Sequence, residues 1–329
     1  MNQTRRTLCA ALSFVAVAGF AGAACAQGYP DRPIRLLVGF TAGSTVDVVA
    51  RTLADGLTKR FGQPVIVENK TGANGALATE TVARAKADGY TLLVSNTSSL
   101  TVNPLLYKNL GYSVPKDFAP ITTITTYPLV LTINPTNPKM ANVRTLTDFV
   151  ALGKAQQNPP LTFGSGGNGN FLQIASEQLI RAAGFKATHV PYRGGTPMQL
   201  ALLSNEVDFN FDTLSAVPQV KAGKLRALAV SENTRWEDLP DVPTVAELGY
   251  PSVQFSAWLG LVAPAGTPPK VIEALHQAMT ELGKDPAVRT RLHAQGRVSL
   301  KSPQAFLEQI NAELAQNADV IKKANISID

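Results

Sequence analysis

The residues with the clearest potential for chemistry form a glycine-rich loop, Gly164–Asn170, with the sequence GSGGNGN. The apolar segment Leu161–Phe163 precedes it, and apolar residues at helical spacing follow from Leu172, so the pattern predicts strand, loop and helix. Asn170 is the expected N-cap of this helix, with Gln173 three residues later as its capping-box partner. Glycines let backbone N–H groups approach a ligand, and a helix N-terminus carries partial positive charge. The pattern therefore suits an anion site without a basic side chain, although a plain turn before a helix also uses glycines.

A second loop of the same kind, Thr41–Thr45, follows the apolar run Ile34–Phe40. Helical spacing begins at its end, with Ser44 as the expected N-cap and Asp47 three residues later as its capping-box partner. Asp47 and Arg51 are four residues apart, and we expect them to pair on the helix surface and to stabilise the helix. The loop would offer backbone N–H groups and two hydroxyls at a helix N-terminus.

A third polar loop, Asn96–Ser99, follows the strand expected over Tyr90–Ser95. Strands alternate with helices along this part of the chain, which predicts a mostly parallel sheet. Ligands of such sheets bind beyond the carboxyl ends of the strands. We therefore expect the three polar loops to lie together on that side.

The remaining elements predict a chain that leaves its first domain, builds a second one and returns. Asp117–Asn134 is rich in β-branched residues and is expected to cross between the domains, Asp241–Gly249 is expected to be a short helix, and Phe255–Val262 is the expected return strand. The expected fold class is α/β, two-lobed, with a ligand cleft between two α/β domains joined by two crossings. The expected boundaries are 27–127 plus 251–329 for domain 1 and 128–250 for domain 2.

The first 26 residues have the features of a secretory signal peptide. Arg5 and Arg6 precede the apolar run Leu8–Phe20, which is too short to span a bilayer, and a small-residue cleavage site ends near Ala26. We therefore expect a periplasmic protein. Lipidation at Cys25 is the alternative. The chain is mildly basic, with a formal net charge of +6 and no cluster of Lys and Arg, so we expect no nucleic-acid partner.

Several classes of chemistry lack their residue patterns. Both cysteines, Cys9 and Cys25, lie in the expected signal peptide, and the three histidines show no metal-ligand spacing, so we expect no metal site. Ser165 does not lie in the G-x-S-x-G pattern of a nucleophile elbow. The loop after Gly167 lacks the third glycine and the acidic residue of a dinucleotide fingerprint, and no phosphate-binding P-loop pattern occurs. We expect no cofactor and no enzymatic activity.

Eight segments in order resemble one family along essentially the whole mature chain, the solute-binding proteins of tripartite tricarboxylate transporters, also called the Bug family. The segments are YPDRPIRLLVGFTAGSTVDVVAR, ENKTGANG, FGSGGNGNF, VPYRGG, VDFNFDTL, KAGKLRALAV, LPDVPTVAELGYP and WLGLVAPAGTP. The resemblance implies a two-lobed periplasmic protein that holds a carboxylate between two loops, Phe40–Thr45 and Ser165–Asn170. The chain departs from the family pattern at Ala42, Ser44, Asn170 and Gln173, which affects selectivity for the far end of the ligand.

The candidate ligand-binding residues come from these loops and from three further positions. Asp212 ends a predicted strand and could meet a ligand amine or hydroxyl, could repel a second carboxylate, or could cap the next turn. Arg193 could neutralise a second carboxylate or be a solvated turn residue. The full set is Phe40, Thr41, Ala42, Gly43, Ser44, Thr45, Ser98, Ser165, Gly166, Asn168, Gly169, Asn170, Arg193 and Asp212.

The function expected from the sequence is capture of a small mono- or dicarboxylate, aliphatic or aromatic, by a monomer that delivers it to the permease subunits of a tripartite transporter. A carboxylate-sensing module that acts on a sensor kinase is the alternative, since the same closed pair of lobes could dock on either partner. An enzyme acting on an organic acid is the weakest alternative. Closure of the lobes would shield hydrogen bonds to the carboxylate from water and so strengthen them.

Overall fold

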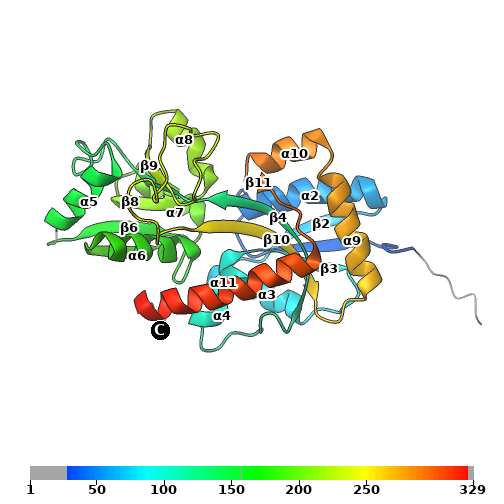
Figure 1. The fold of residues 1–329 in the computed structure, drawn as a ribbon. Coiled ribbons are helices and arrows are strands. Elements are labelled where there is room, and N and C mark those ends of the chain that lie inside the picture. The colour runs from blue at the N-terminus through cyan, green and yellow to red at the C-terminus, as the bar shows by residue number, and fades with distance from the viewer. Residues whose placement is uncertain (1–27, 157, 325–329) are drawn as a thin grey trace, which may run out of the picture. The chain divides into compact units, whose positions relative to one another are not determined.

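Two β-sheets with helices packed against them form the fold in the computed structural model, which describes residues 28–156 and 158–324 (Figure 1). The residues from Arg32 onward belong to one compact unit. The expected signal peptide, with Cys25 and the cleavage site near Ala26, lies outside the described residues.

The first sheet has six strands in the order β11-β4-β10-β3-β1-β2. The apolar β1 is an interior strand with four of its five residues buried, and it pairs in parallel with β2 and β3. The other pairings are antiparallel, so the expected mostly parallel sheet is a mixed one. The strands are β1 (Ile34–Val38), β2 (Val65–Asn69), β3 (Thr91–Asn96), β4 (Phe118–Pro128), β10 (Ser256–Pro264) and β11 (Arg297–Val298). Its helical segments are α2 (Thr45–Phe61), η1 (Ala73–Gly75), α3 (Ala76–Ala83), η2 (Ser98–Val102), α4 (Asn103–Leu106), α9 (Pro269–Leu282), α10 (Pro286–His293) and α11 (Pro303–Ala324).

The second sheet has five strands in the order β7-β6-β8-β5-β9. Strand β6 pairs in parallel with β7 and β8, while β5 is antiparallel to β8 and β9. The strands are β5 (Val130–Ile133), β6 (Leu161–Ser165), β7 (Ala187–Pro191), β8 (Phe209–Asp212) and β9 (Arg226–Val230). Its helical segments are α5 (Leu146–Ala155), α6 (Phe171–Ala183), α7 (Gly195–Leu203), η3 (Leu214–Ala216) and α8 (Val217–Lys221). We call the elements of the first sheet the first lobe and those of the second sheet the second lobe.

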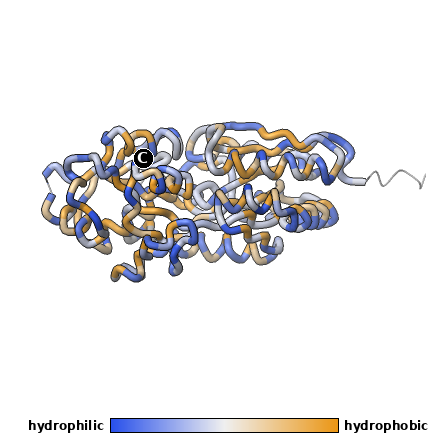
Figure 2. The backbone as a smooth tube through the Cα atoms, turned by 90° about the horizontal axis from the view of Figure 1, so that it is seen from above, coloured by the Kyte–Doolittle hydropathy of each residue, from blue (hydrophilic) through white to orange (hydrophobic). Residues whose placement is uncertain are grey.

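The chain crosses between the lobes twice. Leu129 alone separates β4 of the first sheet from β5 of the second, and β10 returns to the first sheet after β9. In Figure 1 the long strands β4 and β10 run beside each other, as their antiparallel pairing requires. The helices show alternating hydrophobic and hydrophilic colour in Figure 2, which is typical of helices that bury one face against a sheet.

Close packing holds the C-terminal helix on the first sheet. The ring of Phe306 in α11 meets Trp258 of β10 edge to face, with ring centroids 5.1 Å apart. A Cβ at Gly260 would lie 2.2 Å from this phenyl ring, so only glycine lets the helix approach β10 this closely. Burial of two large aromatic side chains stabilises this contact by several kcal/mol, on the order of 2–3 kcal/mol for each ring.

Two expected elements differ from the structure. Asn96 ends β3 instead of opening a loop, and the polar residues after it form the helical segment η2. Asp241–Gly249 is a series of turns instead of a helix. Thr244 makes a β-bridge to Val230, and its N–H donates to the carboxylate of Glu247 at 2.7 Å. The Glu247 N–H donates in return to the Thr244 hydroxyl at 3.0 Å, so the capping box of a helix start is present, but Gly249 ends the turn two residues later with φ 92°.

Candidate functional site

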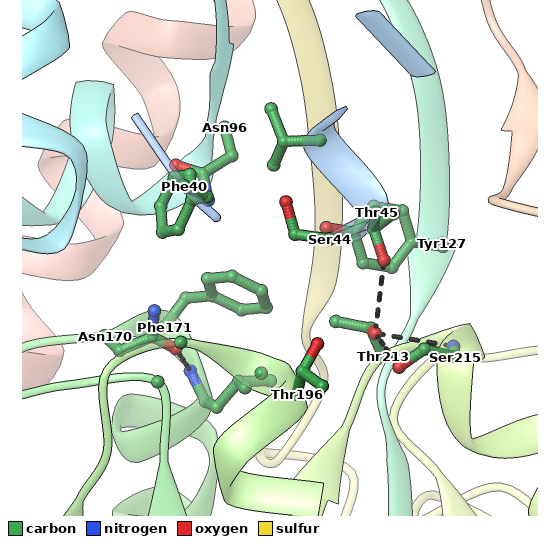
Figure 3. Close-up of a pocket in the computed structure, with 15 residues that line it drawn as sticks. Phe40, Ser44, Thr45, Asn96, Tyr127, Asn170, Phe171, Thr196, Thr213 and Ser215 are labelled. Carbon is green, nitrogen blue, oxygen red and sulfur yellow. Dashed lines mark hydrogen bonds between the residues drawn. The ribbon is translucent and has the colours of Figure 1, made fainter. Parts of the chain in front are cut away.

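A pocket with about 510 Å³ of empty space lies between the two lobes (Figure 3). Among the residues that the structure describes, no charged side chain lines it. The first lobe contributes Phe40, Ser44, Thr45, Val46, Asn96 and Tyr127, and the second contributes Gly166, Asn170, Phe171, Leu172, Gly194, Gly195, Thr196, Thr213 and Ser215. An anion bound here would have to be held by hydrogen-bond donors and backbone dipoles.

The N-terminus of α2 supplies such donors from the first lobe. Ser44 is the N-cap, as expected, and its hydroxyl accepts from the N–H of Asp47 at 3.4 Å. The Asp47 carboxylate accepts from the N–H of Gly43 at 2.9 Å, where the expected capping box would use that of Ser44, and it also pairs with Arg51 as expected. The first two N–H groups of a helix have no partner within it, and Thr45 and Val46, which carry them here, line the pocket.

The N-terminus of α7 supplies matching donors from the second lobe. Gly194 is its N-cap and provides no side-chain cap, and its φ of 111° requires glycine. Gly195 and Thr196 form the first turn and line the pocket. Two helix N-termini, one from each lobe, therefore border a pocket that has no charged side chain. This arrangement favours an anion.

The N–H groups that begin α6 are already bound by protein acceptors. The Phe171 N–H donates to the hydroxyl of Ser98 at 3.0 Å, and the Leu172 N–H donates to Oδ1 of Asn170 at 2.9 Å. Gln173 binds the N–H of Gly169 at 2.8 Å, one residue before the expected capping-box position. The glycine loop contributes to the pocket through Gly166 and Asn170. The first N–H groups of α6 are used instead in a bond to the first lobe, through Ser98, and in the cap made by Asn170.

Two buried side chains that are not among the candidate residues add polar groups to the pocket. Asn96 is 2% exposed, its Oδ1 accepts from the N–H and the hydroxyl of Ser99, and its Nδ2 donates to no residue in the described ranges. Tyr127 is 1% exposed, and burial raises the pKa of its hydroxyl, which therefore keeps its proton. Asn96 had a sequence signal, since it opens the polar loop expected after the strand Tyr90–Ser95. Tyr127 lies in the crossing segment and had none.

A second cavity, which we call the vestibule, lies beside the pocket and has about 1190 Å³ of empty space. It shares Phe40, Gly166 and Gly194 with the pocket. Thr41 and Asn168 line it, and Arg193 is the charged side chain among its lining residues. Eight of the candidate residues thus line one or both cavities, namely Phe40, Thr41, Ser44, Thr45, Gly166, Asn168, Asn170 and Arg193.

The other six candidates, Ala42, Gly43, Ser98, Ser165, Gly169 and Asp212, line neither cavity. Ser98 is fully buried and holds α6 through the Phe171 N–H. The Ser165 hydroxyl lies 2.6 Å from Nε2 of His189 and bonds the carbonyl of Gly167, so it shapes the glycine loop from behind. These two side chains therefore position the residues that line the pocket.

Asp212 lies directly behind the pocket wall. It is 1% exposed, and desolvation raises the pKa of its carboxyl to about 6 even though three hydrogen bonds act to lower it. One oxygen accepts from the Thr213 N–H at 2.8 Å and from the Ser215 hydroxyl at 3.4 Å, and the other accepts from Gln199 at 3.2 Å. Thr213 and Ser215 line the pocket, so this carboxylate acts on the pocket through them.

Asn74 is a further residue that the sequence did not reveal, and it bridges the lobes. It has a left-handed backbone with φ 52°, and its Nδ2 donates to Oδ1 of Asn103 at 2.9 Å and to the carbonyl of Gly169 at 3.1 Å. Its Oδ1 accepts from Nδ2 of Asn170 at 2.9 Å. The Asn74 amide thereby ties the glycine loop of the second lobe to the first lobe.

We expect Asn74→Gly to weaken ligand binding about tenfold, because two neutral hydrogen bonds between the lobes contribute about 1–2 kcal/mol to closure. Glycine adopts the left-handed backbone, so only the side chain is lost. Titration calorimetry measures the change. Asn205→Gly is the matched control, since Asn205 is exposed, has φ 63° and makes no side-chain contact between the lobes. Equal affinities of the two variants would contradict the bridging role.

The described residues show no cluster of three or more His, Cys, Asp or Glu side chains suited to a metal ion. Within the same ranges, every helix is too short or too polar to cross a membrane. The geometry defines a two-lobed binding protein of the periplasmic type, with a pocket and an adjoining vestibule at the junction of its lobes.

Comparison with known proteins agrees with this class. Residues 49–326 match the tripartite tricarboxylate transporter family receptor. The protein BugT of Bordetella pertussis is 35% identical over 331 residues, which is 100% of both chains. The R. palustris protein Rpa4515, solved with adipate, has a TM-score of 0.85 at 29% identity, covering 91% of this chain and 99% of that one. MatC of Rhodopseudomonas palustris, solved with bound malate, has a TM-score of 0.81 at 31% identity, covering 89% and 100%.

The chain therefore belongs to the tripartite tricarboxylate transporter receptors, the Bug family of periplasmic solute-binding proteins. This confirms the resemblance and the fold class expected from the sequence. Proteins of this family and fold are receptors, not enzymes, which also confirms the expectation that this chain is not an enzyme.

Proposed function

We propose that this protein captures a small organic acid in the periplasm and, as a monomer, delivers it to the permease of a tripartite tricarboxylate transporter. The observation that carries the proposal is the pair of helix N-termini, from α2 and α7, beside a pocket without charged side chains. A carboxylate between them would accept from N–H groups of both lobes. Such an anion favours closure, because it gains hydrogen bonds from the second lobe only when the lobes meet.

Further features support the same proposal. The Asn96 amide and the Tyr127 hydroxyl add neutral donors on the first lobe, and Phe40 and Phe171 give the pocket an apolar side. Adipate and malate, the molecules found with two structural neighbours, are carboxylates. The domain boundaries that we propose, near residues 127 and 250, lie where β4 passes into β5 and just before β10 begins.

Thermal unfolding with butyrate and with butyramide tests the proposed binding chemistry. The two molecules have nearly the same shape, but only butyrate carries the charge that the helix N-termini favour. We expect butyrate, adipate or malate at millimolar concentration to raise the melting temperature, since a ligand at 100 times its Kd stabilises the folded state by about 2.7 kcal/mol. Butyramide should leave it unchanged. If no acid raises the melting temperature, or if the amide does so equally, carboxylate capture is refuted.

Transport is tested separately, by uptake of a labelled acid into spheroplasts stripped of periplasmic proteins. Addition of the purified protein should restore uptake. The Gly166→Val variant, whose added side chain occupies the space where the pocket and the vestibule meet, should not restore it. Binding in solution without restored uptake would contradict delivery to a permease and would favour a receptor that acts on a sensor kinase.

A further inference from the structure

One wall of the pocket consists of three hydroxyl side chains in a row with Asp212 behind them. The hydroxyls of Thr45 and Thr213 are 3.5 Å apart, those of Thr213 and Ser215 are 2.9 Å apart, and the Ser215 hydroxyl lies 3.4 Å from Asp212. Figure 3 shows this row on the side of the pocket opposite Phe40 and Phe171. We call Thr45, Thr213 and Ser215 the hydroxyl wall.

The direction of the hydrogen bonds along this wall follows from counting hydrogens. A hydroxyl has one hydrogen to donate, and an ionised carboxylate only accepts. Because Ser215 donates to Asp212, the short contact between Ser215 and Thr213 must use the hydrogen of Thr213. The contact between Thr213 and Thr45 must then use the hydrogen of Thr45. All three hydrogens are directed toward Asp212.

The hydroxyl wall therefore presents only acceptors to a ligand. Thr213 accepts from Thr45 and from the Ser215 N–H, so both of its lone pairs are used. Thr45 keeps two lone pairs and Ser215 keeps one, and both residues line the pocket. A second carboxylate at this wall would meet lone pairs and the nearby charge of Asp212, whereas an O–H or an ammonium group would find acceptors.

We infer that the hydroxyl wall selects organic acids that carry a hydroxyl or ammonium donor close to the bound carboxylate, and that it disfavours a second carboxylate there. The inference rests on the proposed function, because it places the ligand carboxylate at the N-termini of α2 and α7. Thr45 belongs to both groups, since its N–H begins α2 and its hydroxyl begins the wall. The selected donor therefore lies within a few bonds of the carboxylate.

Calorimetric titrations at pH 8, where Asp212 is ionised, test the inference with pairs of acids that differ by one hydroxyl. The pairs are lactate with propionate and 3-hydroxybutyrate with butyrate. At least one hydroxy acid should bind about tenfold more tightly than its parent, the ratio that one well-formed hydrogen bond gives. In Ser215→Ala, Thr213 loses the acceptor for its hydrogen and can donate it to Thr45 or to the ligand, so the preference should fall below about threefold, while the Kd of the parent acid changes by less than about threefold.

Two further variants distinguish the effect of the hydroxyl wall from the effect of the Asp212 charge. Asp212→Asn keeps the oxygen that accepts from Ser215 and from the Thr213 N–H but loses the charge, so the hydroxyl preference should persist while succinate gains affinity relative to butyrate. Ser204→Ala is the matched serine control, since Ser204 is exposed at the far end of α7 and should change neither ratio.

The possible results lead to different conclusions. If propionate and butyrate bind but no hydroxy acid is preferred, or if the preference survives in Ser215→Ala, the inference about the hydroxyl wall is overturned while carboxylate capture stands. If no acid binds at all, the proposed function itself fails.

Discussion

Replacing Gly166 with valine is expected to reduce affinity for carboxylates by up to about a hundredfold while the fold remains intact. Gly166 lines both the pocket and the vestibule, so a side chain there occupies the space where the two cavities meet. Its Cβ would lie 3.1 Å from Nδ2 of Asn170, which is too close for an unchanged loop. Overpacking of this kind costs about 1–3 kcal/mol, and here it acts on the closed lobes.

Titration calorimetry and thermal unfolding of Gly166→Val, Gly166→Ala and Gly62→Ala separate binding from stability. Alanine at 166 should give an intermediate loss of affinity. Gly62 ends α2 with φ 68° and has open space around it, so Gly62→Ala should lower the free energy of unfolding by about 1 kcal/mol and leave affinity unchanged. A lower melting temperature for Gly166→Val with wild-type affinity would contradict a binding role for this position.

The local pattern of the sequence predicted most helices because their signals are local. Thr145 and Asp148 form a complete capping box, and α5 begins immediately after Thr145. Ser44 and Asn170 cap α2 and α6 as expected, and glycines end both helices in the left-handed conformation. The expected helix over Asp241–Gly249 is a single turn, because Gly249 follows its capping box at Thr244 and Glu247 within two residues and is in the left-handed conformation.

The site was less predictable because it depends on contacts between distant segments. The α6 N–H groups were expected to bind an anion, but Ser98, 73 residues earlier in the chain, accepts from one of them. The start of α7 carries the available N–H groups instead, and nothing in a local pattern ranks one helix start above another. Gly43 and Gly166 were both candidate ligand-binding residues. Gly43 has φ 81° and lines neither cavity, so its replacement would first strain the backbone.

The Asp212→Asn variant is expected to be more stable than the wild type at pH 8 and to lose this advantage as the pH falls. In the folded protein the pKa of Asp212 is raised to about 6, because the carboxyl is fully buried without a cation in contact. In the unfolded chain it returns to about 4. The folded state thus binds the proton more tightly, so the stability that protonation contributes is complete below pH 4 and is lost as the pH rises through 6.

The size of the effect follows from the same shift. A difference of about 2 pKa units corresponds to ~3 kcal/mol, and no discount for solvent applies because the group is 1% exposed. Urea unfolding of both proteins at pH 4 and pH 8 measures it, and their difference cancels the titration of all other groups. Asparagine can keep the bonds from Ser215 and the Thr213 N–H, and the Gln199 amide can rotate to accept from it.

Asp208→Asn supplies the contrast that identifies the cause. Asp208 is also buried, but Lys139 lies 3.0 Å from its carboxylate and Thr162 and Asn137 donate to it. Removing that charge leaves a cation without its partner, so Asp208→Asn should destabilise the protein at pH 8, opposite in sign to Asp212→Asn. If Asp212→Asn were also destabilising at pH 8, the carboxylate behind the hydroxyl wall would be a favourable part of the fold. A destabilising carboxylate that is nevertheless present behind the hydroxyl wall agrees with a role in ligand selection, since stability alone would favour asparagine there.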